Sequence, residues 1–163
     1  MFKINFKGDF KKVETFNDGA TIVTLTGRMI IPNFIEDCLP NSVWEWVNNH
    51  PSVKVLGANL TQYYCWIIKV QGQSVCAKDD TFDVKTGERI AESRAKIKLY
   101  KFMQSMTTQL CEYYYALVYG KQGKAVSNFL HPNDDSLYAT NKRYTGLLDH
   151  ERHHLIKLLQ KTV

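Results

Sequence analysis

The sequence predicts an α+β domain in which an antiparallel sheet, built by the N-terminal half, is packed by a long helix and a C-terminal helix. Residues 1–78 hold short runs rich in β-branched and aromatic residues with turn signals between them. From Asp83 onward, apolar residues recur with the helical period instead. Strands followed by helices are typical of an antiparallel sheet with helices on one side. With no internal repeat or linker, residues 1–163 are expected to form a single domain.

The N-terminal half is expected to supply the strands. The turn signal Asn17-Asp18-Gly19 precedes a β-branched run, and Gly27 within that run is a candidate bulge. A second turn is expected at Gln71-Gly72-Gln73, because glycine between polar residues commonly interrupts a strand. The predicted strands are residues 2–6, 20–31, 52–60, 61–71 and 74–78, and a short helix is predicted over residues 40–49.

The C-terminal half is expected to supply two helices. The first is predicted over residues 83–120, with Asp83 as a natural N-cap and Gly120 as a stop. A helix of this length is unusual in a small domain, so one face is expected to cover the sheet and another to pair with a second subunit. Residues 121–144 contain Gly, Asn, Asp and Pro and predict a loop. The last amphipathic helix is predicted over residues 146–160.

Composition and cysteine usage indicate a globular cytoplasmic protein. Hydrophobic residues at 44% and charged residues at 23% argue against disorder. No apolar run approaches the roughly 20 residues of a membrane helix, and the N-terminus lacks the apolar stretch of a signal peptide. The four cysteines form no C-x-x-C pair and are expected to be free structural thiols in a reducing cytosol.

The excess of positive charge is confined to the second half of the chain. Residues 1–82 contain eight Lys/Arg and eight Asp/Glu, whereas residues 83–163 contain thirteen and eight, which accounts for the whole +5. Within the first predicted helix, residues 85–101 carry six cations against two carboxylates. Two interpretations stay open. Arg94 and Lys98 lie one turn apart and suit a phosphate, or the row is a solvated face with an ion pair between Glu92 and Lys96.

One motif matches a zinc hydrolase: His150-Glu151-Arg152-His153-His154 satisfies H-E-x-x-H. The nine residues after it include no His, Asp, Glu or Cys to act as a third ligand. Arg152 would also place a cation beside the metal. We therefore interpret the motif as the polar face of a terminal helix. Since the sequence shows no nucleophile elbow, Walker A loop or dinucleotide fingerprint either, we expect no enzyme activity, metal or cofactor.

Residues 75–96, with the sequence VCAKDDTFDVKTGERIAESRAK, resemble a module of small bacteriophage proteins. The named family that this module most resembles is the phage anti-Thoeris sponge, which sequesters cyclic ADP-ribose-type signals made by bacterial TIR enzymes. The resemblance implies an anti-defence binding protein that forms a homo-oligomer in the host bacterial cytoplasm and binds a small anionic nucleotide. The implied contacts are Arg28, Arg89 and Arg94 for the phosphates and Phe82 for the base.

Two other functions stay open from the residues. The first is nucleic-acid binding through the basic helix over residues 85–101, since phosphate contacts and stacking are the usual means of such binding. The second is inhibition of a host defence protein. No membrane partner is expected.

Overall fold

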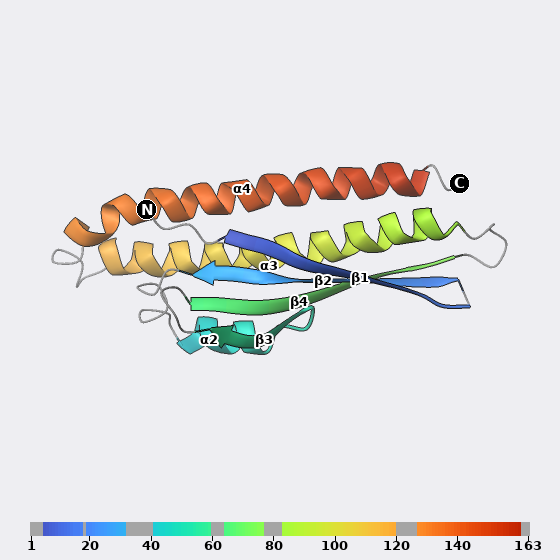
Figure 1. Cartoon of the computed structure of the whole chain (residues 1–163). Coiled ribbons are helices and arrows are strands. Elements are labelled where there is room, and N and C mark those ends of the chain that lie inside the picture. Colours follow the sequence, from blue (N-terminus) through green and yellow to red (C-terminus); the bar gives the residue numbers. More distant parts are fainter. Residues whose placement is uncertain are drawn as a thin grey trace.

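A computed structural model describes residues 5–17, 19–31, 41–59, 64–76, 83–119 and 127–160. It confirms the predicted class: a four-stranded antiparallel sheet lies against one long helix, and a second long helix packs beside the first (Figure 1). None of the helices in these ranges is long and apolar enough to cross a membrane. The elements are β1 (Asn5–Thr15), β2 (Ala20–Ile31), α2 (Asn41–Asn48), β3 (Val53–Asn59), β4 (Tyr64–Val75), α3 (Val84–Tyr119) and α4 (Ser127–Gln160).

The sheet has the order β1-β2-β4-β3, and its core face lies under α3. The register between β2 and β4 places Met29 opposite Trp66, and both side chains are fully buried. Phe102 of α3 is fully buried in the same cluster. Side chains alternate across a strand, so this pairing leaves every second residue of β2 and β4 on the opposite face.

Two predicted turns have different outcomes. At the end of β1, the turn before β2 is confirmed: Gly19 has φ 80°, a conformation that glycine adopts without strain. The turn predicted at Gln71-Gly72-Gln73 is wrong, because β4 runs through these residues and pairs them with β2. Gly72 instead allows α3 to lie close against β4. A Cβ at Gly72 would lie 2.0 Å from the carbonyl oxygen of Ala91 in α3.

Helix α3 has the predicted bounds and the predicted cap. The Asp83 carboxylate accepts hydrogen bonds from the backbone N–H of Lys85 (3.1 Å) and of Thr86 (3.2 Å). It also accepts one from the Thr86 hydroxyl, and this bond is the main reason that the pKa of Asp83 lies below its usual value. Acceptors at this position satisfy backbone donors that the first turn leaves without partners.

Helix α4 begins at Ser127 and not at Gly146, so the predicted loop is wrong from residue 127 onward. Residues 121–126 lie outside the described part of the chain. The reason for the difference is packing. Leu137, Tyr144, Leu148 and Leu158 of α4 are buried and lie seven, four and ten residues apart, which continues one helical stripe through the composition that suggested a loop.

The second apolar face of α3 is covered by α4 of the same chain. Ser93 bonds Glu151, whereas Gln104, further along α3, bonds Thr145, so the two helices run antiparallel. Figure 1 shows them side by side over most of their length. The prediction that this face pairs with a second subunit was motivated by a helix face without a partner in the chain, and α4 supplies that partner. A homo-oligomer stays a prediction.

Cys76 and Cys111 are half-buried, and the expectation of free structural thiols stays a prediction. The side chains of Cys38 and Cys65 lie outside the described part of the chain.

A half-buried histidine joins α2 to the core. The ring of His50 packs edge-on against Trp46 (5.0 Å between centroids) and Phe102 (5.1 Å). Its Nδ1 accepts a hydrogen bond from the backbone N–H of Ser52 (3.3 Å), which requires an unprotonated nitrogen. Burial, with a smaller contribution from Lys101, lowers the pKa of His50 below 6.5.

This geometry predicts a pH-dependent stability. The unfolded chain binds a proton at His50 more readily than the folded chain does, so the histidine's contribution is complete above pH 6.5 and declines as pH falls toward the folded pKa. Urea unfolding at pH 7.5, 6.5 and 5.5 should therefore show a steeper loss for the natural protein than for His50→Gln. Parallel losses in the two proteins would contradict this role.

Candidate functional site

A pocket of about 460 Å³ lies between β1, β2, α3 and α4. Its apolar lining comes from both layers, with Phe6 and Leu25 from the sheet and Leu99 and Leu147 from the helices. The lining also includes charged and phenolic side chains, namely Asp9, Lys11, Glu92, Lys96, Tyr100, Arg143 and Tyr144, together with Gly8, Phe10 and Thr26. The pocket has the size and the mixed lining that are typical of small-molecule sites.

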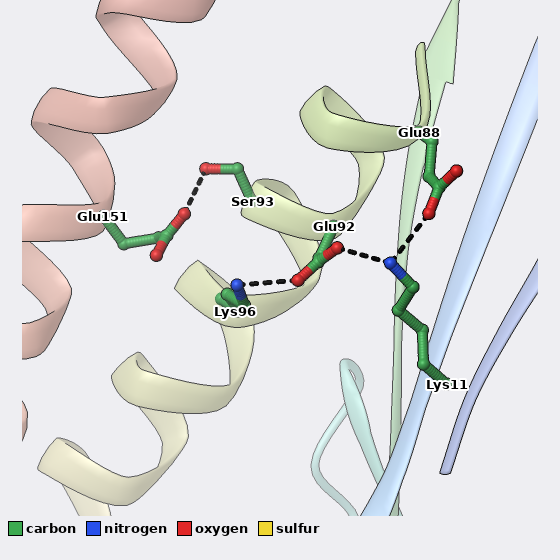
Figure 2. Close-up of polar contacts among 6 residues, drawn as sticks. All are labelled: Lys11, Glu88, Glu92, Ser93, Lys96 and Glu151. Carbon is green, nitrogen blue, oxygen red and sulfur yellow. Dashed lines mark hydrogen bonds and ion pairs between the residues drawn. The ribbon is translucent and has the colours of Figure 1, made fainter. Parts of the chain in front are cut away.

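Two lysines of the pocket share one carboxylate. The Nζ of Lys11 donates to Oε2 of Glu92 (2.7 Å) and to Oε1 of Glu88 (2.7 Å). The Nζ of Lys96 donates to the other oxygen of Glu92 at 2.7 Å. Figure 2 shows this chain of contacts, which links β1 to two successive turns of α3. The two ammonium groups are therefore held close to one point of the pocket wall.

The charges of this cluster are fixed at neutral pH. The hydrogen bonds that the Lys11 ammonium donates to Glu88 and Glu92 raise the pKa of Lys11. Burial disfavours the ammonium of Lys96, but its contacts with Glu92 outweigh burial and raise its pKa as well. Burial likewise opposes ionisation of Glu92, yet the two lysines hold its pKa below the usual value. At this point of its wall the pocket thus carries two permanent ammonium ions and one carboxylate. Asp9 and Arg143 also line the pocket.

Two tyrosines form the wall between α3 and α4. The rings of Tyr100 and Tyr144 have centroids 6.4 Å apart and are tilted by 39°. The Tyr144 hydroxyl accepts a hydrogen bond from the backbone N–H of Phe6 (3.1 Å) and so ties α4 to β1. Burial raises the pKa of both phenols, so both are neutral hydroxyls at physiological pH. Next to Tyr144, the exposed Arg143 adds a third cation at the pocket.

The H-E-x-x-H residues point to different surroundings. Glu151 is buried and accepts a hydrogen bond from the Ser93 hydroxyl (2.7 Å), as Figure 2 shows. Of the two histidines that the motif would use as ligands, His150 is exposed and His154 is half-buried. The intervening His153 is exposed, and its Nδ1 lies 2.7 Å from the Asp149 carbonyl oxygen. Within the described ranges, no three His, Cys, Asp or Glu side chains lie close enough to hold a metal ion. Glu151 therefore joins two helices here.

Arg94 and Lys98 contact the sheet. The Nη1 of Arg94 donates to the Gln73 carbonyl oxygen (2.7 Å), and the Nζ of Lys98 donates to that of Gln71 (2.8 Å). Strand β3 pairs with β4 only as far as Val70, so these two carbonyls lie on a stretch of edge that β3 leaves uncovered. The two cations bond to backbone acceptors that would otherwise depend on water.

The structure does not bring together Arg28, Arg89 and Arg94, the three predicted contact residues that it describes. Arg28 forms a two-pronged ion pair with Asp9 (2.7 and 3.0 Å) and lies opposite Ile67. That position is six residues, or about 20 Å, along β4 from the Gln73 carbonyl that Arg94 contacts. Arg89 is exposed on α3, and Phe82 lies outside the described part of the chain. Their ligand-binding role stays a prediction.

Sequence reasoning does not identify the residues of the pocket as a site, although it gives a partial signal for Glu92 and Lys96. Both belong to the module over residues 75–96, and an ion pair between them is one of the two interpretations that the sequence leaves open. The structure has this ion pair. Lys11 carries no sequence signal, because its direction depends on the register of β1. Arg143 and Tyr144 fell in the predicted loop.

No protein-family model, curated protein or solved structure matches this chain. The pocket itself is therefore the basis for a functional assignment.

Proposed function

We propose that this chain is a non-enzymatic binding protein that captures a small anionic nucleotide in the pocket between β1, β2, α3 and α4. The observation that carries the proposal is the combination, in one pocket of about 460 Å³, of three cations with aromatic walls. Lys11 comes from the sheet, Lys96 from α3 and Arg143 from α4. Three cations against two carboxylates, Asp9 and Glu92, line one volume, and this excess of positive charge suits an anion.

Each part of a nucleotide has a counterpart in the lining. Phosphate oxygens match the ammonium of Lys96 and the guanidinium of Arg143, which can form two parallel hydrogen bonds. A base matches the faces of Tyr100 and Phe6. The Glu92 carboxylate can accept hydrogen bonds from ribose hydroxyls or an exocyclic amine. Tight capture needs no covalent step.

The resemblance over residues 75–96 supports the same class of ligand. The C-terminal end of that module contributes Glu92 and Lys96 to the pocket. We infer that the protein acts as a phage sponge for a cyclic ADP-ribose-type signal and so weakens a bacterial TIR defence. In this proposal the phosphate contacts are Lys11, Lys96 and Arg143, and they replace Arg89 and Arg94.

Capture from extracts tests the proposal. Protein incubated with extracts of cells that express TIR defence enzymes is washed and heat-denatured, and the released small molecules are identified by mass spectrometry. We expect an unmodified nucleotide from the natural protein and at least about tenfold less from Arg143→Met, because a hydrogen bond to a charged group is worth roughly 1.5–3 kcal/mol.

The matched control is Lys142→Met, which removes an exposed cation beside Arg143 that does not line the pocket. It should release as much nucleotide as the natural protein. A cleaved nucleotide would identify an enzyme, and an empty natural protein would refute the proposal.

A further inference from the structure

The sheet face opposite α3, here called the outer face, is not covered by any described helix. Helix α2 lies on the α3 side, since Trp46 stacks on Phe102 of α3 at 5.2 Å. Helix α4 packs against α3. On the outer face, Phe10 is 62% exposed and Val75 is 63% exposed. An open sheet face with large apolar side chains is an interaction surface unless a partner covers it.

The outer face carries excess positive charge. Its cations include Lys7 of β1, Lys54 of β3 and Lys69 of β4, and none of these three has an ion-pair partner among the described residues. Two further cations are neutralised within the chain, because Lys12 pairs with Glu14 at 2.6 Å and Arg28 pairs with Asp9. Among the residues that the structure describes, the uncompensated charge on this face is therefore +3.

Two of the free lysines face each other across the sheet. The register places Lys54 of β3 directly opposite Lys69 of β4. Like charges in this position destabilise a sheet, and an anionic partner would relieve the repulsion. A second copy of this chain would instead bring another set of unpaired lysines to the same place. The charge therefore favours a polyanion.

The same row across the sheet ends on an aromatic side chain. Lys69 pairs with Thr26 of β2, and Thr26 pairs with Phe10 of β1. Neighbouring strands are about 4.8 Å apart, so Phe10 lies roughly 10 Å from Lys69 along the row. Cations and an exposed ring at this separation can contact the phosphates and a base of one nucleic-acid strand at the same time.

We propose that the outer face binds single-stranded nucleic acid, with Lys54 and Lys69 on phosphates and Phe10 stacked on a base. Bases must be unstacked to reach a sheet surface, which favours single strands over a duplex. This surface differs from the basic helix over residues 85–101. There, Arg94 and Lys98 are bound to carbonyl oxygens of β4, and Lys96 lines the nucleotide pocket. The outer face adjoins that pocket, because Phe10 and Thr26 line the pocket as well, but Lys54 and Lys69 do not line it.

Fluorescence anisotropy with labelled 12-nucleotide DNA and RNA strands, and with a DNA hairpin duplex, tests the proposal at 50 and 200 mM KCl. We expect the single strands to bind more tightly than the duplex. Removing both lysines in Lys54→Ala/Lys69→Ala should lower the slope of log K against log salt by about 1.4, since each phosphate contact on a single strand contributes roughly 0.7. Phe10→Ala should weaken binding about tenfold.

The matched control is Lys157→Ala, an exposed lysine of α4, which should leave both affinity and slope unchanged. Arg143→Met should also leave strand binding unchanged, and this separates the outer face from the pocket. No binding of either single strand at 50 mM KCl would overturn the proposal, as would an unaltered slope in the double variant. Equal binding of a polyglutamate peptide would indicate an acidic protein partner and would overturn it too.

Discussion

Replacing Gly72 by alanine should destabilise the fold by at least about 3 kcal/mol, the upper range for forcing an extra methyl group into a packed core. Gly72 is buried in β4 under α3. A Cβ there would lie 2.0 Å from the Ala91 carbonyl oxygen and 2.5 Å from the Ala95 backbone nitrogen. Both are backbone atoms of α3, so no side-chain rotation can relieve the overlap and the helix must move away from the sheet.

Gly146→Ala is the matched control, because it adds the same methyl group to an exposed position of α4 with no atom within 4 Å. It should stabilise the protein by about 0.5–1 kcal/mol through helix propensity. Urea unfolding followed by far-ultraviolet circular dichroism measures both changes. A Gly72→Ala protein as stable as the natural one would show that α3 does not approach β4 this closely.

Replacing Phe102 by alanine should cost about 3–5 kcal/mol, as is typical for a fully buried phenylalanine. Its ring stacks on Trp46 with an interplanar angle of 9° and receives the edge of His50. The side chain is thus the contact between α2, α3 and the sheet core. Because a domain has only about 5–15 kcal/mol in total, this loss is a large fraction of its stability and should clearly lower the urea concentration at the midpoint of unfolding.

The neighbouring exposed residue gives the control for Phe102. Lys101→Ala should change the free energy of unfolding by less than about 0.5 kcal/mol, as surface substitutions usually do. A loss below 1 kcal/mol for Phe102→Ala would mean that α2 is not packed on α3 in solution.

Local signals were enough to predict α3, the turn at Gly19 and the strand that follows it, but β1 runs over Asn5–Thr15 and not over the predicted residues 2–6. Asp83 caps α3 through hydrogen bonds to residues two and three positions away, and Gly19 forms a turn between adjacent strands. Both features depend on a few consecutive residues. The start of α4 and the course of β4 depend instead on what lies across the interface. Gly72 is read locally as a turn residue, but its role is set by Ala91 and Ala95 of a helix some twenty residues later.

The direction of Lys11 shows why the pocket could not be predicted. The register between β1 and β2 shifts between Gly8 and Phe10, so Asp9 is an extra residue in β1 opposite Gly27. Gly27 was the candidate bulge, but the extra residue lies on the partner strand. One inserted residue reverses which side chains face the core. It turns Lys11 toward α3 and places Phe10 on the outer face.

Cations on one helix also proved to have different roles. Arg94, Lys96 and Lys98 lie within five residues and carry the same charge, yet one contacts Glu92 in the pocket and two contact carbonyls of β4. Helical spacing gives their relative directions only. Which of them is available to a ligand depends on the elements that pack around the helix.

The central claim concerns the place where a nucleotide binds, and a two-dimensional ¹H–¹⁵N spectrum titrated with ADP-ribose tests it most directly. This probe carries a pyrophosphate, riboses and an adenine. The account predicts that the backbone amides of Lys11, Lys96, Tyr100 and Tyr144 shift together and saturate with one dissociation constant. Shifts confined to the surroundings of Arg28 or Arg89, or a spectrum that ADP-ribose leaves unchanged at millimolar concentration, would contradict it.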